Sequence, residues 1–190
     1  EKRNKNLPKF KISNICPACN SIATKKDNES VLRCQNNECD AKIKGQIEHY
    51  VSKNCVDIDG LGNKIIELLI NNKLINNFSD LYKLNSEQIS NLDRMGDKSA
   101  KNIINAINKS KHTTLAKFIN GLGIRNVGQN AAKLLEKNFS GNIDKLINSS
   151  REELIGINEF GEIMADSLIT YFSNINNISN IKECIKYGMV

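Results

Sequence analysis

The sequence is organised around the turn Asp59-Gly60-Leu61-Gly62, which precedes the apolar run Ile65-Ile66-Glu67-Leu68-Leu69. Similar turns follow at Asp93-Arg94-Met95-Gly96, Arg125-Asn126-Val127-Gly128 and Asn158-Glu159-Phe160-Gly161. Their final glycines lie 34, 32 and 33 residues apart. A fixed period of this size is typical of repeat architectures, in which each repeat is one supersecondary unit. The chain is therefore expected to contain a tandem array of four units.

Each unit is expected to consist of a helix, a tight hairpin and a second helix, because apolar residues recur at helical spacing and strand alternation is hard to find. The intervening helices carry two capping-box patterns, Asn85-x-x-Gln88 and Ser150-x-x-Glu153. The final glycine of each hairpin is expected to permit a positive φ or a close approach of the backbone. An apolar residue inside each hairpin is expected to plug the core, namely Leu61, Met95, Val127 and Phe160.

The second helix of each hairpin is a candidate phosphate site. Its first N–H groups lack partners within the helix, and the helix dipole makes this end electropositive. Such an end can hold a phosphate group without reading a base. The alternative is a helical repeat whose glycines only end helices and bind no ligand. Four hairpins in register, behind a segment of residues 1–55 with 11 Lys and Arg against 6 Asp and Glu, favour binding to a nucleic-acid backbone.

Four of the six cysteines have the spacing C-x2-C-x14-C-x4-C, namely Cys16, Cys19, Cys34 and Cys39. Two short-spaced thiol pairs separated by a loop are the ligand pattern of a tetrahedral structural zinc site. The alternative is two disulfides, which a cytoplasmic setting disfavours because thiols stay reduced there. Four thiolates leave no open position for a water molecule, so the zinc is expected to be structural. Cys55 and Cys184 stand alone and are expected to be buried as small hydrophobes.

The composition excludes several function classes. The 190 residues are 39% hydrophobic, which is enough for a core, but aromatic residues make up only 5% and Trp is absent. A base-stacking surface is therefore not expected to be the main binding device. No apolar run approaches the roughly 18 residues of a membrane span, and residues 1–14 do not resemble a secretory signal. We expect a cytoplasmic location, no membrane partner and, because the chain does not begin with Met, a fragment of a longer protein.

In combination, these motifs resemble the zinc-finger plus helix-hairpin-helix portion of bacterial NAD-dependent DNA ligases. The resemblance runs from about residue 12 to the end of the chain. It implies a mostly α fold with a small four-cysteine zinc finger at 12–41, a helix-hairpin-helix domain of four hairpins at 42–190, and the tail of a preceding oligonucleotide-binding barrel at 1–11. The stretches that carry it are Cys16-Pro17-Ala18-Cys19, Arg33-Cys34-Gln35-Asn36-Asn37-Glu38-Cys39, Val56-Asp57-Ile58-Asp59-Gly60-Leu61-Gly62-Asn63-Lys64, Phe78-Ser79-Asp80-Leu81-Tyr82, Leu92-Asp93-Arg94-Met95-Gly96-Asp97-Lys98-Ser99-Ala100 and Leu122-Gly123-Ile124-Arg125-Asn126-Val127-Gly128.

The resemblance implies the DNA-clamping, C-terminal part of a monomeric ligase, which seals nicks in double-stranded DNA during replication and repair together with the other domains of the same enzyme. Hairpins two to four depart from the Gly-x-Gly pattern, with Arg94, Asn126 and Glu159 at the first glycine position. Glu159 places a carboxylate where a phosphate would lie, so the fourth hairpin is expected to bind DNA poorly or to serve packing. The implied DNA-binding residues are Gly60, Gly62, Lys64, Arg94, Gly96, Lys98, Arg125 and Gly128.

The nucleophile of the family's chemistry is not found in this sequence. Family ligases attack NAD with the lysine of a Lys-x-Asp-Gly motif, and the near match Asp57-Ile58-Asp59-Gly60 has Asp in its place. NAD and Mg²⁺ are expected to bind parts of the enzyme outside this chain. No residue here is expected to be catalytic, and His49 and His112 lie apart on expected helices. Two alternatives stay open: a stand-alone, non-enzymatic module that binds nicked or branched DNA in a repair or recombination complex, and an array that packs against protein.

Overall fold

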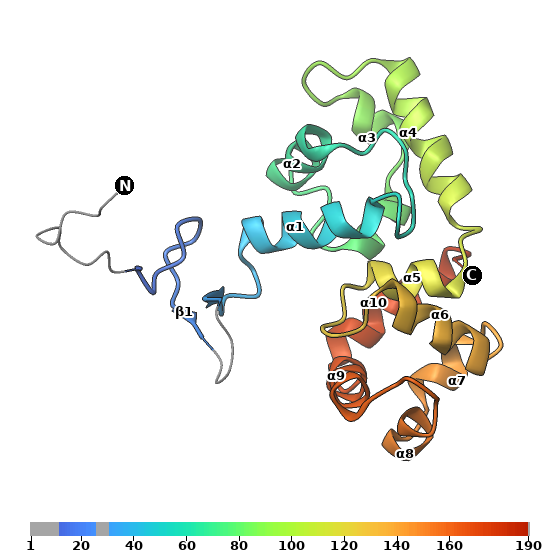
Figure 1. Ribbon diagram of the computed structural model, residues 1–190. Helices are drawn as coiled ribbons and strands as arrows, with labels where there is room; N and C mark the ends of the chain where they lie inside the picture. The colour runs from blue at the N-terminus through green and yellow to red at the C-terminus, as the bar shows by residue number, and fades with distance from the viewer. Residues whose placement is uncertain (1–11, 26–30, 190) are drawn as a thin grey trace, which may run out of the picture. The chain divides into compact units, whose positions relative to one another are not determined.

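The computed structural model describes residues 12–25 and 31–189, and these form a mostly helical chain (Figure 1). The expected barrel tail, residues 1–11, lies outside the described residues. The chain divides into two compact units, with the boundary between Ile43 and Lys44. Within the described residues, strands occur only in the first unit. The predicted fold class, a mostly α chain with a small four-cysteine module followed by a helical array, is confirmed.

The first unit is built from two short strands and the beginning of a helix. β1 (Ala23–Thr24) pairs antiparallel with β2 (Arg33–Cys34), and an isolated bridge joins Ile15 to Ile22. α1 (Asp40–Val51) starts directly after the second cysteine pair and continues into the second unit. The described part of the first unit has few buried apolar residues, namely Cys16, Ala23 and Cys39. These residues are too few to form a hydrophobic core.

The second unit consists of helices joined by short turns. Three hairpins are framed by packed helix pairs, α3 with α4, α5 with α6, and α8 with α9. The first hairpin differs, because an irregular segment, residues 52–58, separates the end of α1 from Asp59. After α1, the helices in chain order are α2 (Asn63–Asn71), the 3-10 helix η1 (Phe78–Lys83), α3 (Ser86–Ser90), α4 (Asp97–Ser110), α5 (Leu115–Gly121), α6 (Gln129–Asn138), α7 (Ile143–Ile147), α8 (Arg151–Ile155), α9 (Glu162–Phe172) and α10 (Ile175–Lys186).

Side chains from three helices meet at Tyr50, near the end of α1. The ring of Tyr50 stacks on Phe78 of η1 with centroids 4.7 Å apart, and it meets the edge of Phe118 of α5 at 6.3 Å. The hydroxyls of Tyr50 and Tyr82 share a hydrogen bond of 2.9 Å, and burial raises the pKa of both phenols. Gly121 lies close beside this cluster, because a Cβ there would be 3.1 Å from Tyr50 Cδ2 and would press on the ring. Helices α1, η1 and α5 therefore share one core.

The predicted helix starts agree with the structure. Both capping boxes are present, at Asn85 before α3 and at Ser150 before α8. An unpredicted third box starts η1, where Asn77 accepts hydrogen bonds from two backbone N–H groups and Asp80 accepts one from the backbone of Asn77. Short polar side chains at these positions satisfy donors that a helix leaves without partners.

The predictions for single residues agree with the structure in most places and differ at two, one in burial and one in secondary structure. Cys55 and Cys184 are fully buried, as predicted. Met95 is only half-buried, so the prediction that it plugs the core is wrong, whereas the other three hairpin residues are buried. His49 lies on α1, but His112 lies in the turn after α4 and not on a helix. Among the described residues, no helix is long and apolar enough to cross a membrane.

Candidate nucleic-acid interface and metal centre

Four cysteine side chains converge in the first unit. The sulfur atoms of Cys16, Cys19, Cys34 and Cys39 all lie within 4.8 Å of one another. The sulfurs of Cys19 and Cys34 are 3.5 Å apart, and those of Cys16 and Cys39 are 4.0 Å apart. Around a tetrahedral zinc with Zn–S bonds of about 2.3 Å, neighbouring sulfurs lie about 3.8 Å apart. The four thiols therefore fit a tetrahedral metal ion of this size.

The same distances decide against two disulfides. A disulfide holds its sulfurs about 2.05 Å apart, and all four cysteines are free thiols. Hydrogen bonds from Ser21 lower the pKa of Cys19 to about 6, whereas desolvation raises the pKa of Cys34 to about 12. If all four were thiolates this close, they would repel one another unless a cation lay between them, so the arrangement suits a bound cation.

Every hairpin turns at a residue with left-handed backbone. The φ angle is 82° at Gly60, 59° at Arg94, 60° at Asn126 and 65° at Glu159. These residues occupy the first position of the Gly-x-Gly pattern, where glycine adopts a positive φ without steric cost. The three non-glycine residues therefore change the chemistry of the hairpin tip while the turn itself is kept.

The final glycines of the hairpins have extended backbone, so of the two predicted alternatives the positive φ is wrong, and the close approach of the backbone stays a prediction. Gly62, Gly96, Gly128 and Gly161 have φ angles of −80°, −98°, −93° and −78°. Any residue can adopt these angles. A Cβ built on any of the four meets no atom within 4 Å. Neither strain nor packing within the protein therefore calls for glycine, and each glycine leaves open space at the start of a helix.

The four helices that begin at these glycines have no side-chain cap. No side chain bonds to the first N–H groups of α2, α4, α6 or α9. In contrast, an Asn, Thr or Ser side chain caps η1, α3, α5, α7, α8 and α10. Because a helix N-terminus has N–H groups without intrahelical partners and a positive dipole end, the four hairpin ends present donors suited to an anion.

Basic side chains lie beside three of these uncapped ends. Lys64 is the second residue of α2 and Lys98 the second residue of α4, and both are exposed. Arg94 is 92% exposed at the tip of the second hairpin, where Asp93 lies 3.5 Å from its guanidinium. Arg125 is exposed in the third hairpin. The exposed cations and the exposed N–H groups thus occur together in hairpins one to three.

The structure brings Lys64 and Arg94 to one cavity, although 30 residues separate them in the sequence. This cavity of about 600 Å³ lies between α2 and the second hairpin. Leu68 and Met95, both half-buried, supply apolar lining. These two residues were not predicted to belong to the site, because the pattern assigns Met95 to the core. A signal was present in the neighbouring sequence, since the charged residues Asp93 and Arg94 precede Met95 and Gly96-Asp97 follow it.

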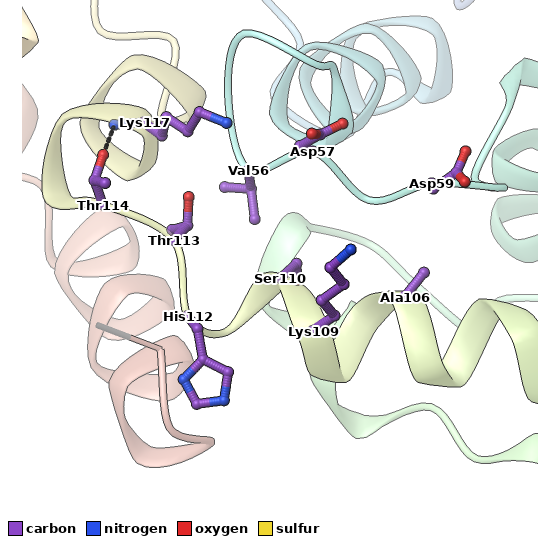
Figure 2. Close-up of a pocket in the computed structure, with 10 residues that line it drawn as sticks. All are labelled: Val56, Asp57, Asp59, Ala106, Lys109, Ser110, His112, Thr113, Thr114 and Lys117. Carbon is purple, nitrogen blue, oxygen red and sulfur yellow. Dashed lines mark hydrogen bonds between the residues drawn. The ribbon is translucent and has the colours of Figure 1, made fainter.

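A second cavity, of about 420 Å³, lies beside the first hairpin and is shown in Figure 2. Asp57 and Asp59 reach it from the segment around the first hairpin, and Lys109 and Lys117 reach it from α4 and α5. Two carboxylates and two ammonium groups balance one another here, as Glu67 and Asp93 balance Lys64 and Arg94 in the first cavity, so neither cavity concentrates charge of either sign. The second cavity contains none of the predicted DNA-binding residues and differs in this respect from the hairpin ends.

Two parts of the chain match known sequence families. Residues 117–181 match the family described as "Helix-hairpin-helix motif", and residues 55–109 match the family described as "SAM-like Helix-hairpin-helix tandem". Together the two ranges include all four hairpins.

Longer relatives match almost the whole chain. The DNA ligase of Bacillus licheniformis is 42% identical over 189 residues, which is 100% of this chain and 28% of that protein. The DNA ligases of Clostridioides difficile and Bacillus subtilis are 42% and 41% identical over 180 residues, which is 95% of this chain and 27% of each protein.

The chain is homologous to a segment of DNA ligases. It spans little more than a quarter of the length of these relatives. The predicted resemblance to DNA ligases is thereby confirmed, and the ligase homologues agree with the helix-hairpin-helix family matches.

Proposed function

We propose that this chain is the DNA-clamping part of an NAD-dependent DNA ligase, and that it grips nicked double-stranded DNA by the backbone without sequence preference. The observation that carries the proposal is the set of uncapped helix starts, three of which have exposed Lys or Arg beside them. The ligase relatives support the same function. They favour it over a stand-alone, non-enzymatic DNA-binding module.

In this proposal the backbone N–H groups at the hairpins donate hydrogen bonds to phosphate oxygens, and the neighbouring cations neutralise phosphate charge. Neither contact reads a base, so the protein positions DNA and does not select a sequence. The residues proposed for these contacts are those predicted from the sequence, namely Gly60, Gly62, Lys64, Arg94, Gly96, Lys98, Arg125 and Gly128. The whole enzyme would act as a monomer in the cytoplasm, with the other ligase domains as intramolecular partners.

We assign the four-cysteine site to structural zinc. Cys16, Cys19, Cys34 and Cys39 would hold the ion, and their sulfur spacing fits a tetrahedral site. The ion would supply folding energy to a module whose described residues form no hydrophobic core. We place this zinc finger at residues 12–41 and the helix-hairpin-helix domain at 42–190. NAD and Mg²⁺ would bind other parts of the ligase, because this chain has no Lys-x-Asp-Gly motif.

The experiment that tests DNA clamping measures the affinity of the chain for two labelled nicked duplexes of unrelated sequence over a range of salt concentrations. Equal affinities are expected, with a log–log salt slope of about 0.9 for each phosphate neutralised. Lys98→Ala should lower the slope by about 0.9 for both sequences. The matched control is Lys182→Ala, which removes an exposed lysine from α10 outside the hairpins.

A salt-independent affinity, or a change of sequence preference in the Lys98 variant, would contradict the proposal. The choice between a ligase part and a stand-alone module has a separate test. A Lys-x-Asp-Gly motif encoded in the same reading frame as this chain supports the ligase, and its absence from that frame supports the module.

A further inference from the structure

We infer that the fourth hairpin holds no phosphate and instead supports the third hairpin, so that the clamp contacts DNA through three hairpins. This inference rests on the proposed function and refines it. The fourth hairpin shares the backbone of the others, with a positive φ at Glu159 and an uncapped glycine at Gly161. Its side chains, however, differ from those of the other hairpins at two positions beside the N–H groups.

Two equivalent positions show the difference. At the left-handed tip, the first three hairpins carry a neutral or basic residue, whereas the fourth carries an exposed carboxylate at Glu159. Two residues after the final glycine, the first three hairpins carry a polar or basic residue, whereas the fourth carries Ile163, which is 71% exposed. The residues at this second position are Lys64, Lys98, Asn130 and Ile163. A phosphate at the fourth hairpin would therefore meet a like charge and no cation.

The nearby arginine is already bound within the protein. Arg151 of α8 donates hydrogen bonds of 2.6 Å to Asp166 and 3.0 Å to Glu162, both on α9. The guanidinium lowers the pKa of the Asp166 carboxyl, mainly through their hydrogen bond. Glu162 is the first residue of α9, where a carboxylate also complements the helix dipole. The positive end of α9 is thus compensated by side chains of the protein. The starts of α2 and α6 have no acid in their first turn, and α4, which has Asp97 there, also carries the exposed cation Lys98 as its second residue.

The helix after the fourth hairpin makes a contact with the third hairpin, which gives the fourth hairpin a structural role. Asn126, the left-handed residue at the tip of the third hairpin, donates a hydrogen bond of 2.9 Å from its side chain to Ser167 Oγ of α9. The helix that follows the fourth hairpin therefore holds the tip of the third. In this arrangement α9 orients the uncapped start of α6 and contributes no phosphate contact of its own.

The test places the same carboxylate at the final glycine of each hairpin. Gly62→Asp, Gly96→Asp, Gly128→Asp and Gly161→Asp are matched, because all four sites have open space and ordinary φ angles. Aspartate is a preferred N-cap residue, so each variant should fold. Circular dichroism and thermal melting would check that each variant is folded. The first three variants should bind nicked duplex about tenfold or more weakly, the loss expected for one charge-assisted contact. Gly161→Asp should bind within about twofold of the parent chain.

A complementary variant gives the fourth hairpin the side chains of the second. Glu159→Arg combined with Ile163→Lys should raise the salt slope by about 0.9 for a phosphate newly held. An unchanged slope in this variant would contradict the argument that side-chain charge prevents binding there. Equal weakening by all four aspartate variants would overturn the inference while leaving DNA clamping intact. If none of the four weakened binding, the proposed function itself would fail.

Discussion

Loss of the metal is expected to unfold the first unit and to leave the second unit folded. In the described part of the first unit, the buried apolar residues are Cys16, Ala23 and Cys39, and the two cysteines belong to the metal cluster. Burial of the remaining methyl group, at Ala23, contributes about 1 kcal/mol. A structural zinc site contributes about 10–16 kcal/mol in small zinc modules. The metal therefore outweighs apolar burial in this unit by about tenfold.

Cys34→Ser removes one ligand and provides the test. Elemental analysis of the parent chain should find one zinc ion per molecule, and the variant should have lost it. Hydrogen exchange read by mass spectrometry should show lost protection in the described residues of 14–41, with α2 to α10 unchanged. The matched control is Cys184→Ala, because Cys184 is also a buried free thiol but lies outside the cluster. This control should keep the zinc.

Two results would refute this reasoning. The first is a metal-free parent chain whose first unit stays protected from exchange. The second is a pair of disulfides among the four cysteines, detected by mass spectrometry of the unreduced protein. Either result would mean that covalent bonds or packing, and not a cation, hold the module together.

Three further predictions concern the second unit and the chemistry of the chain. Gly121→Ala should lower the free energy of unfolding in urea by about 1–3 kcal/mol, because the added Cβ would press on Tyr50; Gly45→Ala, which has open space on α1, should not lower it. Tyr82→Phe should cost about 1 kcal/mol in the same assay, because the buried hydroxyl of Tyr50 loses one hydrogen-bond partner and keeps only the weaker one, Cys184, and no loss would mean that Cys184 satisfies the hydroxyl alone. Incubation with NAD and Mg²⁺ should add no AMP to the chain, as intact-mass measurement would show, because the lysine nucleophile is missing.

Features that depend on local spacing could be predicted from the sequence. The cysteine spacing predicts the cluster because a two-residue gap places both thiols on one side of a turn, and the four sulfurs do converge. The capping boxes at Asn85 and Ser150 involve residues three positions apart, so they could be predicted without knowledge of the fold. The fourfold repeat was visible because its glycines recur at nearly constant spacing.

Features that depend on distant partners or on the backbone of the whole hairpin could not be predicted. The positive φ falls on Arg94 and Glu159, residue types that rarely adopt it, as well as on Asn126, which adopts it more readily, because the hairpin imposes this conformation on the side chain that is present. The half-burial of Met95 follows from its position beside a cavity that α2 completes. The contact between Tyr50 and Tyr82 joins residues 32 positions apart, and no periodic pattern indicates it.

The helix starts fall into two groups: those capped by a side chain, which stabilise the fold, and those that begin at a glycine, which are proposed to bind phosphate. A side-chain cap and a phosphate oxygen compete for the same N–H groups, so a helix cannot offer its start to DNA while its own Asn or Ser occupies it. The six capped elements use their starts for stability. A glycine in place of a better cap costs only a few tenths of a kcal/mol, whereas a charge-assisted hydrogen bond is worth about 1.5–3 kcal/mol. The four glycine starts thus lower the stability of the fold only slightly. At three of them, the free energy of binding from one phosphate contact would exceed the folding free energy lost by having no side-chain cap.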